Sequence, residues 1–101
     1  MRYETLVEQV KRAIFSSAGE TSVELRRAAA EQRLSELPEN LRAYVANVAQ
    51  HAYRVTDEDV EALKRAGYSE DQLFEITGAT AVGAALRRLD VGLRVLKESA
   101  R

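Results

Sequence analysis

The residues best suited to chemistry gather on one predicted helix. His51 is the only histidine of the chain, and an imidazole titrates near neutral pH, which suits a general base or a ligand-binding group. Asn40, Tyr44 and Asn47 precede it at helical spacing, so they share one flank of that helix. We therefore take Tyr44 and Asn47 as candidate ligand-binding residues. The alternative is a half-exposed helix flank on which His51 bonds a backbone carbonyl.

Two further side chains are candidate acid–base groups. Glu75 is the only charged residue within residues 73–86, and a carboxyl shielded from water would have a raised pKa and could donate a proton, especially beside His51. Tyr53 follows His51 by two residues and is the third candidate catalytic residue. Against catalysis, Glu75 lies near the start of its helix, where the helix dipole favours a carboxylate, and an arginine could pair with it.

The adjacent residues Arg87 and Arg88 could receive an anionic ligand or partner. More often, such residues complement the C-terminal end of a helix and solvate its outer face. A metal site is not expected, because one His and no Cys leave only carboxylates, and the consecutive acidic residues 57–59 point in different directions on a helix. The sequence has no glycine-rich phosphate loop, and we predict no cofactor.

Composition limits the partners of the protein. The chain has 101 residues, a formal net charge of −1 and no Cys. A nearly neutral chain has no electrostatic attraction to nucleic acid or to an anionic membrane, and no apolar run approaches the ~20 residues of a membrane span. The absence of Cys excludes disulfides, thiolate metal sites and thiol catalysis. Charges interrupt the apolar residues of the amino terminus, which is unlike a secretory signal, so we predict a cytoplasmic protein.

Every periodic segment has helical spacing, which predicts an all-α chain. We expect a first helix that ends around residues 16–19 and a second, begun by a capping box at residues 21–24, that runs to about Leu34 with Arg26 pointing outward. Further helices are expected from Pro38 to about Ala52, from residue 56 to residue 67, and from residue 69 to about residue 96.

The strongest local signal is a doubled pattern of helix caps. Thr56 and Ser69 can cap two consecutive helices, and Gly67 can end the first of them. The second helix is apolar or small on every side over residues 73–86, so we expect it to be buried all round. The other helices are too short to cover it, which predicts a homo-oligomer. A central helix in a compact bundle is the alternative.

Residues 52–93 resemble the carboxymuconolactone decarboxylase / alkyl hydroperoxidase D (AhpD)-like family, in the sequence AYRVTDEDVEALKRAGYSEDQLFEITGATAVGAALRRLDVGL. The match covers about residues 37–96, whereas residues 1–36 match only in being helical. The resemblance implies a single domain over residues 1–101, an AhpD-like bundle of about five helices. It also implies assembly through buried helices, commonly as a trimer or hexamer.

Relatives in this family include thiol-dependent peroxidases and a decarboxylase of aromatic catabolism. The peroxidases carry a Cys-x-x-Cys pair and then a His, and the matching positions fall near Ala52, Val55 and Asp59. None of these is Cys or His, so peroxidase activity is not expected. We predict an oligomeric scaffold or small-molecule-binding protein. The alternative is a cysteine-independent decarboxylase or isomerase of a small organic acid, with His51 as the acid–base group.

Overall fold

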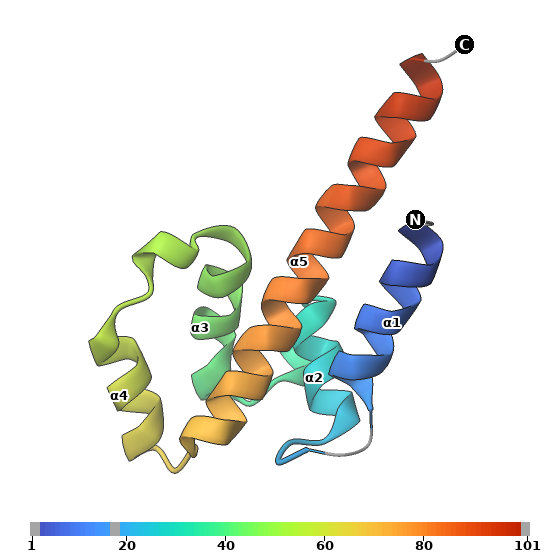
Figure 1. Cartoon of the computed structure of the whole chain (residues 1–101). Coiled ribbons are helices and arrows are strands. Elements are labelled where there is room, and N and C mark those ends of the chain that lie inside the picture. Colours follow the sequence, from blue (N-terminus) through green and yellow to red (C-terminus); the bar gives the residue numbers. More distant parts are fainter. Residues whose placement is uncertain (1–2, 17–18, 100–101) are drawn as a thin grey trace.

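The computed structural model describes residues 3–16 and 19–99, and in these ranges the chain is helical and has no strand. The all-α prediction is therefore confirmed for this part of the chain. It comprises α1 (Tyr3–Phe15), α2 (Val23–Ala30), α3 (Glu39–Gln50), α4 (Asp57–Arg65) and α5 (Glu70–Ser99), with short 3-10 turns η1 (Leu34–Glu36) and η2 (Ala52–Arg54) (Figure 1).

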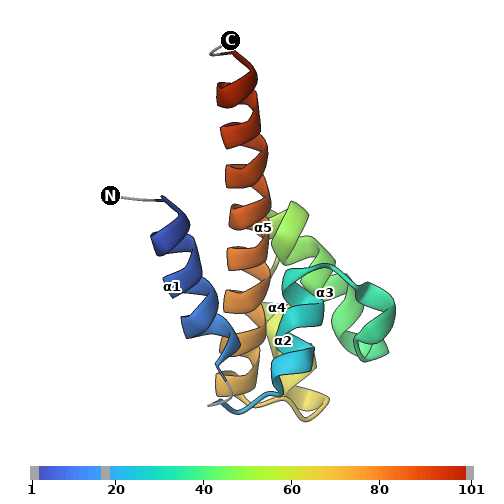
Figure 2. The same cartoon turned by 90° about the vertical axis from the view of Figure 1, so that its right-hand side faces the viewer.

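Helix α5 is the axis around which the other helices are arranged. In Figure 1, α1 lies on one side of it and α3 and α4 lie on the other, while α2 packs against its first half. Its 30 residues make a rod of about 45 Å, and its last turns project beyond the bundle (Figures 1 and 2). In the described residues, no helix combines the length and the apolar character that crossing a membrane requires.

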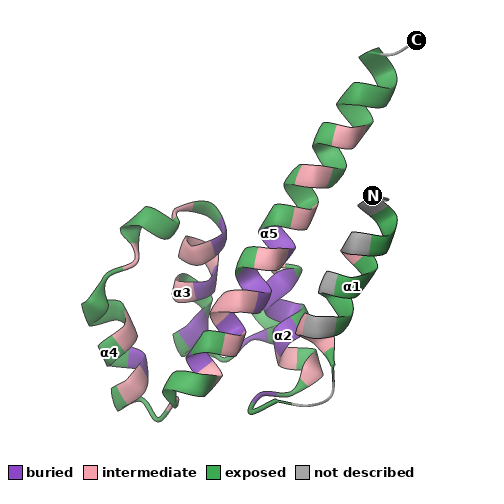
Figure 3. Cartoon of the chain, in the orientation of Figure 1, coloured by how far each residue is buried: buried purple, intermediate pink, exposed green. Residues whose placement is uncertain are grey.

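The hydrophobic core lies where α2, α3 and the first half of α5 meet (Figure 3). Its largest fully buried side chains are Leu41 and Val45 of α3 and Ile76 and Thr80 of α5. The Thr80 hydroxyl donates to the Ile76 carbonyl at 2.7 Å, so this buried polar group has a partner one helical turn away. Leu63 of α4 also belongs to this cluster, so four helices contribute to the core.

The doubled cap pattern is confirmed. Thr56 and Asp59 form a capping box at the start of α4, and Ser69 and Gln72 form another at the start of α5, with hydrogen bonds of 3.0 and 2.9 Å. Gly67 ends α4 with φ of 112°, a left-handed conformation that glycine adopts without a Cβ clash. Each of these signals involves residues a few positions apart, and the helices begin and end where the signals predict.

Helix α2 ends at Ala30, four residues before the predicted boundary at Leu34. The reason is Gln32, which adopts φ of 58° and so turns the chain as glycine usually does at the end of a helix. The next amide, of Arg33, donates to the Ala28 carbonyl at 2.9 Å. The Gln32 side-chain amide donates to the Ala29 carbonyl at 3.0 Å, which helps a non-glycine residue to hold this position.

The prediction that residues 73–86 are buried on every side is wrong within one chain. Residues on one face of this stretch are buried: Leu73, Ile76, Ala79, Thr80, Gly83 and Ala84. On the opposite face, Phe74 is 79% exposed, and Ala81 and Ala85 are exposed as well. The other helices are few and short, and they leave the side of α5 with Phe74, Ala81 and Ala85 uncovered.

Gly83 marks the closest approach of α5 to another helix. A Cβ at this position would overlap the carbonyl group and Cα of Ala30, at the end of α2. Backbone atoms cannot move aside as a flexible side chain can, so Gly83 is the residue that lets these two helices touch.

We therefore expect Gly83→Ala to destabilise the fold by about 1–3 kcal/mol, the usual cost of overpacking. The matched control is Gly78→Ala on the same helix, where a Cβ meets nothing within 4 Å, and which should gain up to about 1 kcal/mol of helix propensity. Chemical unfolding at low protein concentration measures both. Equal stabilities for the two variants would contradict this account of the contact between α2 and α5.

Candidate functional site

Glu75 joins the start of α5 to the loop between α1 and α2. Its carboxylate accepts hydrogen bonds from the Glu20 amide at 2.7 Å, the Thr21 amide at 3.0 Å and the Thr21 hydroxyl at 2.6 Å. A Cβ at Gly19 would lie 2.9 Å from its Oε1, so the loop passes close to the carboxylate. These contacts occupy both oxygens of Glu75 in holding the chain together.

This contact also explains a difference at the start of α2. The sequence predicts a capping box at residues 21–24, but the hydroxyl of Thr21 donates to Glu75 instead. Ser22 is the N-cap, and its hydroxyl accepts a hydrogen bond from the Leu25 amide at 3.1 Å. The N-cap is Ser22 instead of Thr21, because the Thr21 hydroxyl is engaged by the carboxylate of Glu75.

Arg26 is buried, and the prediction that it points outward is wrong. Its exposed fraction is 3%, and its guanidinium donates to the carbonyls of Ile14 at 2.5 Å, Ser16 at 2.7 Å and Thr21 at 3.2 Å. The last carbonyls of a helix lack partners within it, and this arginine supplies donors to the end of α1. Its Nε also lies 3.9 Å from Oε1 of Glu75.

The environment of Glu75 lowers its pKa instead of raising it. The largest cause is the hydrogen bond from the Glu20 amide, followed by that from the Thr21 hydroxyl, and the charge of Arg26 acts in the same direction. Donors that bind the charged form favour ionisation. The proton donor with a raised pKa that the sequence suggested is therefore not found here, and the alternative, a carboxylate with structural partners, describes Glu75.

His51 lies at the C-terminal end of α3. Its amide donates to the Asn47 carbonyl at 2.7 Å, and its half-buried ring meets the ring of Tyr53 edge-on, with centroids 5.9 Å apart and planes at 78°. Tyr53 itself is 79% exposed. These two candidate residues are thus in contact, on a corner of the molecule beside η2.

The proposed pairing of His51 with Glu75 is wrong. The end of α3 that carries His51 and the loop between α1 and α2 that holds Glu75 lie at opposite ends of the bundle (Figure 1). Acid–base catalysis requires groups within hydrogen-bonding reach of a shared substrate. The structure does not bring these two together.

The other polar residues of α3 mainly connect helices. The Tyr44 hydroxyl shares a hydrogen bond with the Thr77 hydroxyl of α5 at 2.6 Å, and Asn40 accepts one from the Tyr68 hydroxyl at 2.8 Å. Tyr44 also lines a shallow depression of about 270 Å³ beside Phe74, whereas Asn47 is half-buried near the end of the helix. The polar flank of α3 therefore divides between different neighbours and does not surround one cavity.

The positions that match the peroxidase motif serve the architecture of the chain. Ala52 begins η2 and Val55 follows it. Asp59 accepts a hydrogen bond from the Thr56 amide at 2.9 Å and returns one from its own amide to the Thr56 hydroxyl at 3.2 Å. The position at which the resemblance would place a histidine is thus a helix cap.

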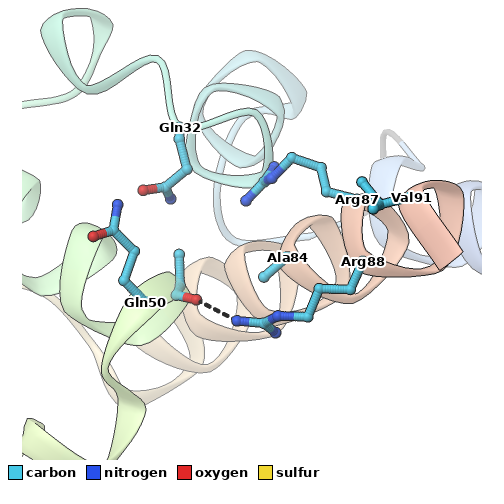
Figure 4. Close-up of a pocket in the computed structure, with 7 residues that line it drawn as sticks. Gln32, Gln50, Ala84, Arg87, Arg88 and Val91 are labelled. Atoms are coloured by element: carbon cyan, nitrogen blue, oxygen red, sulfur yellow. Dashed lines mark hydrogen bonds between the residues drawn. The ribbon is translucent and has the colours of Figure 1, made fainter. Parts of the chain in front are cut away.

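A larger groove lies on the other side of the bundle, where α2 and α3 end against α5. Its volume is about 730 Å³, and it is lined by Gln32, Ala49, Gln50, Ala84, Arg87, Arg88 and Val91 (Figure 4). The Arg88 guanidinium donates to the Ala49 carbonyl at 3.0 Å, and that of Arg87 donates to the Ala30 carbonyl. These arginines do bind helix ends, but the ends are those of α2 and α3, whereas the sequence did not indicate neighbouring helices.

Sequence reasoning identified the two arginines but not the groove around them. Gln32 and Gln50 are separated from them by more than thirty positions along the chain, and only the folded chain places them on one cavity. The pattern of consecutive arginines was the one signal available. Two consecutive arginines indicate a positive charge, but they do not indicate which groups surround it in the folded chain.

Among the residues that the structure describes, no three His, Cys, Asp or Glu side chains gather in a way that could hold a metal ion. Comparisons with protein-family models, with curated proteins and with solved structures find no match to this chain. The resemblance to the AhpD-like family therefore stays a prediction.

The first test of the site concerns Glu75. Because its pKa in the folded state lies below the ordinary value of 4.5, its contribution to stability is present above that value and is lost as the pH falls through the lowered pKa. Glu75→Gln should destabilise the protein at neutral pH by about 1–3 kcal/mol, because an amide NH₂ would face an N–H donor.

Urea unfolding from neutral pH down to about pH 3 measures this effect. The variant should lose less stability than the unchanged protein on acidification. The control is Glu98→Gln, an exposed carboxylate of the same helix, which should leave both the stability and its pH dependence nearly unchanged. Identical pH profiles for Glu75→Gln and the unchanged protein would refute the structural role of this carboxylate.

Proposed function

We propose that this chain is a non-catalytic, self-associating scaffold domain of the AhpD-like type, whose partner is a second copy of itself. The observation that carries the proposal is the uncovered side of α5. We call it the outer face; it consists of the exposed residues Phe74, Ala81, Ala85 and Gly92 and the half-buried Gly78. These positions follow helical spacing along one side of the rod.

The residues of the outer face are apolar or small, and the charged residue beside them is Arg88, three positions after Ala85 and four before Gly92. Phe74 is 79% exposed, although burying such a side chain is typically worth about 1.5–3 kcal/mol. Within residues 73–86 of α5 the one charged residue, Glu75, binds the loop between α1 and α2 and is not part of this face. A contiguous exposed apolar surface of this kind favours contact with another protein surface.

The two glycines of the outer face have no explanation within one chain. Among the residues that the structure describes, a Cβ at Gly78 or at Gly92 meets no atom within 4 Å, in contrast to Gly83. Glycine inside a helix costs about 1 kcal/mol relative to alanine. At both positions this loss of helix stability is not offset by a close contact within the described chain. Glycine permits a close approach of another backbone, which a second helix on this face would use.

A second copy fits this face because the face is complementary to itself. If two α5 helices pack antiparallel through this face, with residue 83 of each at the same level, Phe74 of one copy lies opposite Gly92 of the other. Ala81 then lies opposite Ala85, and Gly78 lies opposite Arg88. The largest side chain then meets a position without one. Such a contact is two-fold symmetric, and it gives a dimer alone or joins two trimers into the hexamer that the family resemblance implies.

A scaffold role also agrees with the state of the candidate catalytic residues. Glu75 is engaged by the loop, His51 is at the other end of the bundle, and Asp59 caps α4. Each has a structural partner instead of a shared cavity. These placements support a non-catalytic domain.

Self-association is tested by placing a charge on the outer face. Phe74→Glu should convert the oligomer to a monomer, because a carboxylate buried against an apolar partner is strongly unfavourable. The matched control is Tyr53→Glu, since Tyr53 has the same exposed fraction of 79% but lies outside α5. Light scattering at micromolar concentration gives the mass of each. A monomeric unchanged protein, or an oligomer that survives Phe74→Glu, would rule out the outer face as the interface.

The absence of thiol chemistry gives a second test. The chain has no Cys, and the thiolate is the nucleophile in thiol-dependent peroxide reduction. With an organic hydroperoxide and a dithiol donor, the rate should equal that of the same mixture without protein. Turnover proportional to the protein concentration would contradict the non-catalytic assignment.

A further inference from the structure

The groove at the ends of α2 and α3 has a polar part and an apolar part. Arg87 and Arg88 place their guanidinium groups on either side of Ala84, and the amides of Gln32 and Gln50 face them across the opening (Figure 4). Val91 continues the floor along α5. At about 730 Å³, the groove is of the size that usually holds a small molecule.

The charge of the groove favours an anion. None of the residues that line it is acidic, and the two arginines contribute two positive charges. The C-terminal ends of α2 and α3 oppose them with about half a negative charge each. The balance is about one positive charge, which a carboxylate neutralises and a doubly charged phosphate exceeds.

The arginines are already fixed in place. A guanidinium has five N–H donors, and the bonds to the carbonyls of Ala30 and Ala49 each engage one nitrogen. The remaining N–H groups are held in a defined orientation beside the groove. Binding a carboxylate therefore requires little further loss of side-chain freedom, which is the main benefit of a preorganised site.

An apolar track leaves the groove along α5. Val91 and Val95 are separated by one helical turn and so lie on the same side of the helix. Val91 lines the groove, and the two valines are 56% and 55% exposed. The track begins at the arginines, so a molecule with a charged head and an apolar chain would meet both features together.

We propose that this groove binds an amphipathic carboxylate of the fatty-acid class. The carboxylate lies between Arg87 and Arg88, and the alkyl chain follows Ala84, Val91 and Val95. The site adjoins the outer face at Arg88, and all the residues that line it come from one chain. It gives the domain a ligand whose head is recognised by charge and whose chain is recognised by burial.

The experiment titrates the full chain with octanoate, below its micellar concentration, and follows backbone amide signals by NMR. Octanoate should shift the signals of residues around Ala84, Arg88 and Val91. It should bind at least about tenfold more tightly than acetate, because burial of its methylene groups adds to the affinity. It should also bind more tightly than the uncharged octanol.

Val91→Asp places a negative charge in the groove at an exposed position, so the fold is expected to persist. It should weaken octanoate binding at least about tenfold, as a like charge near the carboxylate requires. The control is Leu96→Asp, 66% exposed on the same helix and outside the groove, which should leave octanoate affinity unchanged. Light scattering on both variants records the oligomeric state separately, so a failure of self-association remains distinguishable from a failure of binding.

Three results would overturn the proposal. Equal affinity for octanoate and octanol would show that the arginines do not recognise the head. Equal affinity for octanoate and acetate, or binding of inorganic phosphate without binding of octanoate, would show that the apolar track is not used. Unchanged octanoate affinity in Val91→Asp would place the ligand elsewhere on the molecule.

Discussion

The short helices of this protein depend on donors that other helices bring to their C-terminal ends. The last carbonyls of a helix have no partners within it, and here Arg26, Arg87 and Arg88 supply donors to the ends of α1, α2 and α3. A hydrogen bond that involves a charged group is worth about 1.5–3 kcal/mol, a large share of the stability of a small domain. Each arginine thereby fixes where one helix stops relative to another.

This arrangement requires close contact between the helices that share an arginine. At Gly83 the end of α2 touches α5, which brings the Ala30 carbonyl within reach of Arg87, one turn further along α5. At the other end of the bundle, Glu75 holds the loop that leads into α2. Helix α2 is thus fastened at both ends to the same long helix, and its eight residues would not form a stable helix alone.

The parts of the fold that follow from neighbouring residues could be predicted from the sequence. The caps at Thr56 and Ser69 and the stop at Gly67 are examples, since each involves residues a few positions apart. The buried position of Arg26 could not, because its acceptors lie on another helix. The turn at Gln32 could not be predicted either, because its positive φ is usually signalled by a glycine in the sequence.

The groove, too, could be predicted from the sequence only in part. The sequence identified Arg87 and Arg88 and the alternative in which they complement helix ends. It did not reveal that two helices converge there and leave a groove. It also suggested that His51 and Glu75 could meet, because helical periodicity gives the side of a helix on which a residue lies and not the end of the bundle to which it is carried.

The last turns of α5 extend beyond the bundle, so a force on them acts on the rest of the same helix. The same continuous helix carries the core residue Ile76, the contact at Gly83, both groove arginines and the free last turns. A helix of this length resists bending. A molecule that binds the projecting turns and tilts them would therefore also move Arg87 and Arg88 relative to the ends of α2 and α3. Mechanical strain applied far from the core would thus be delivered to the hydrogen bonds that terminate two other helices.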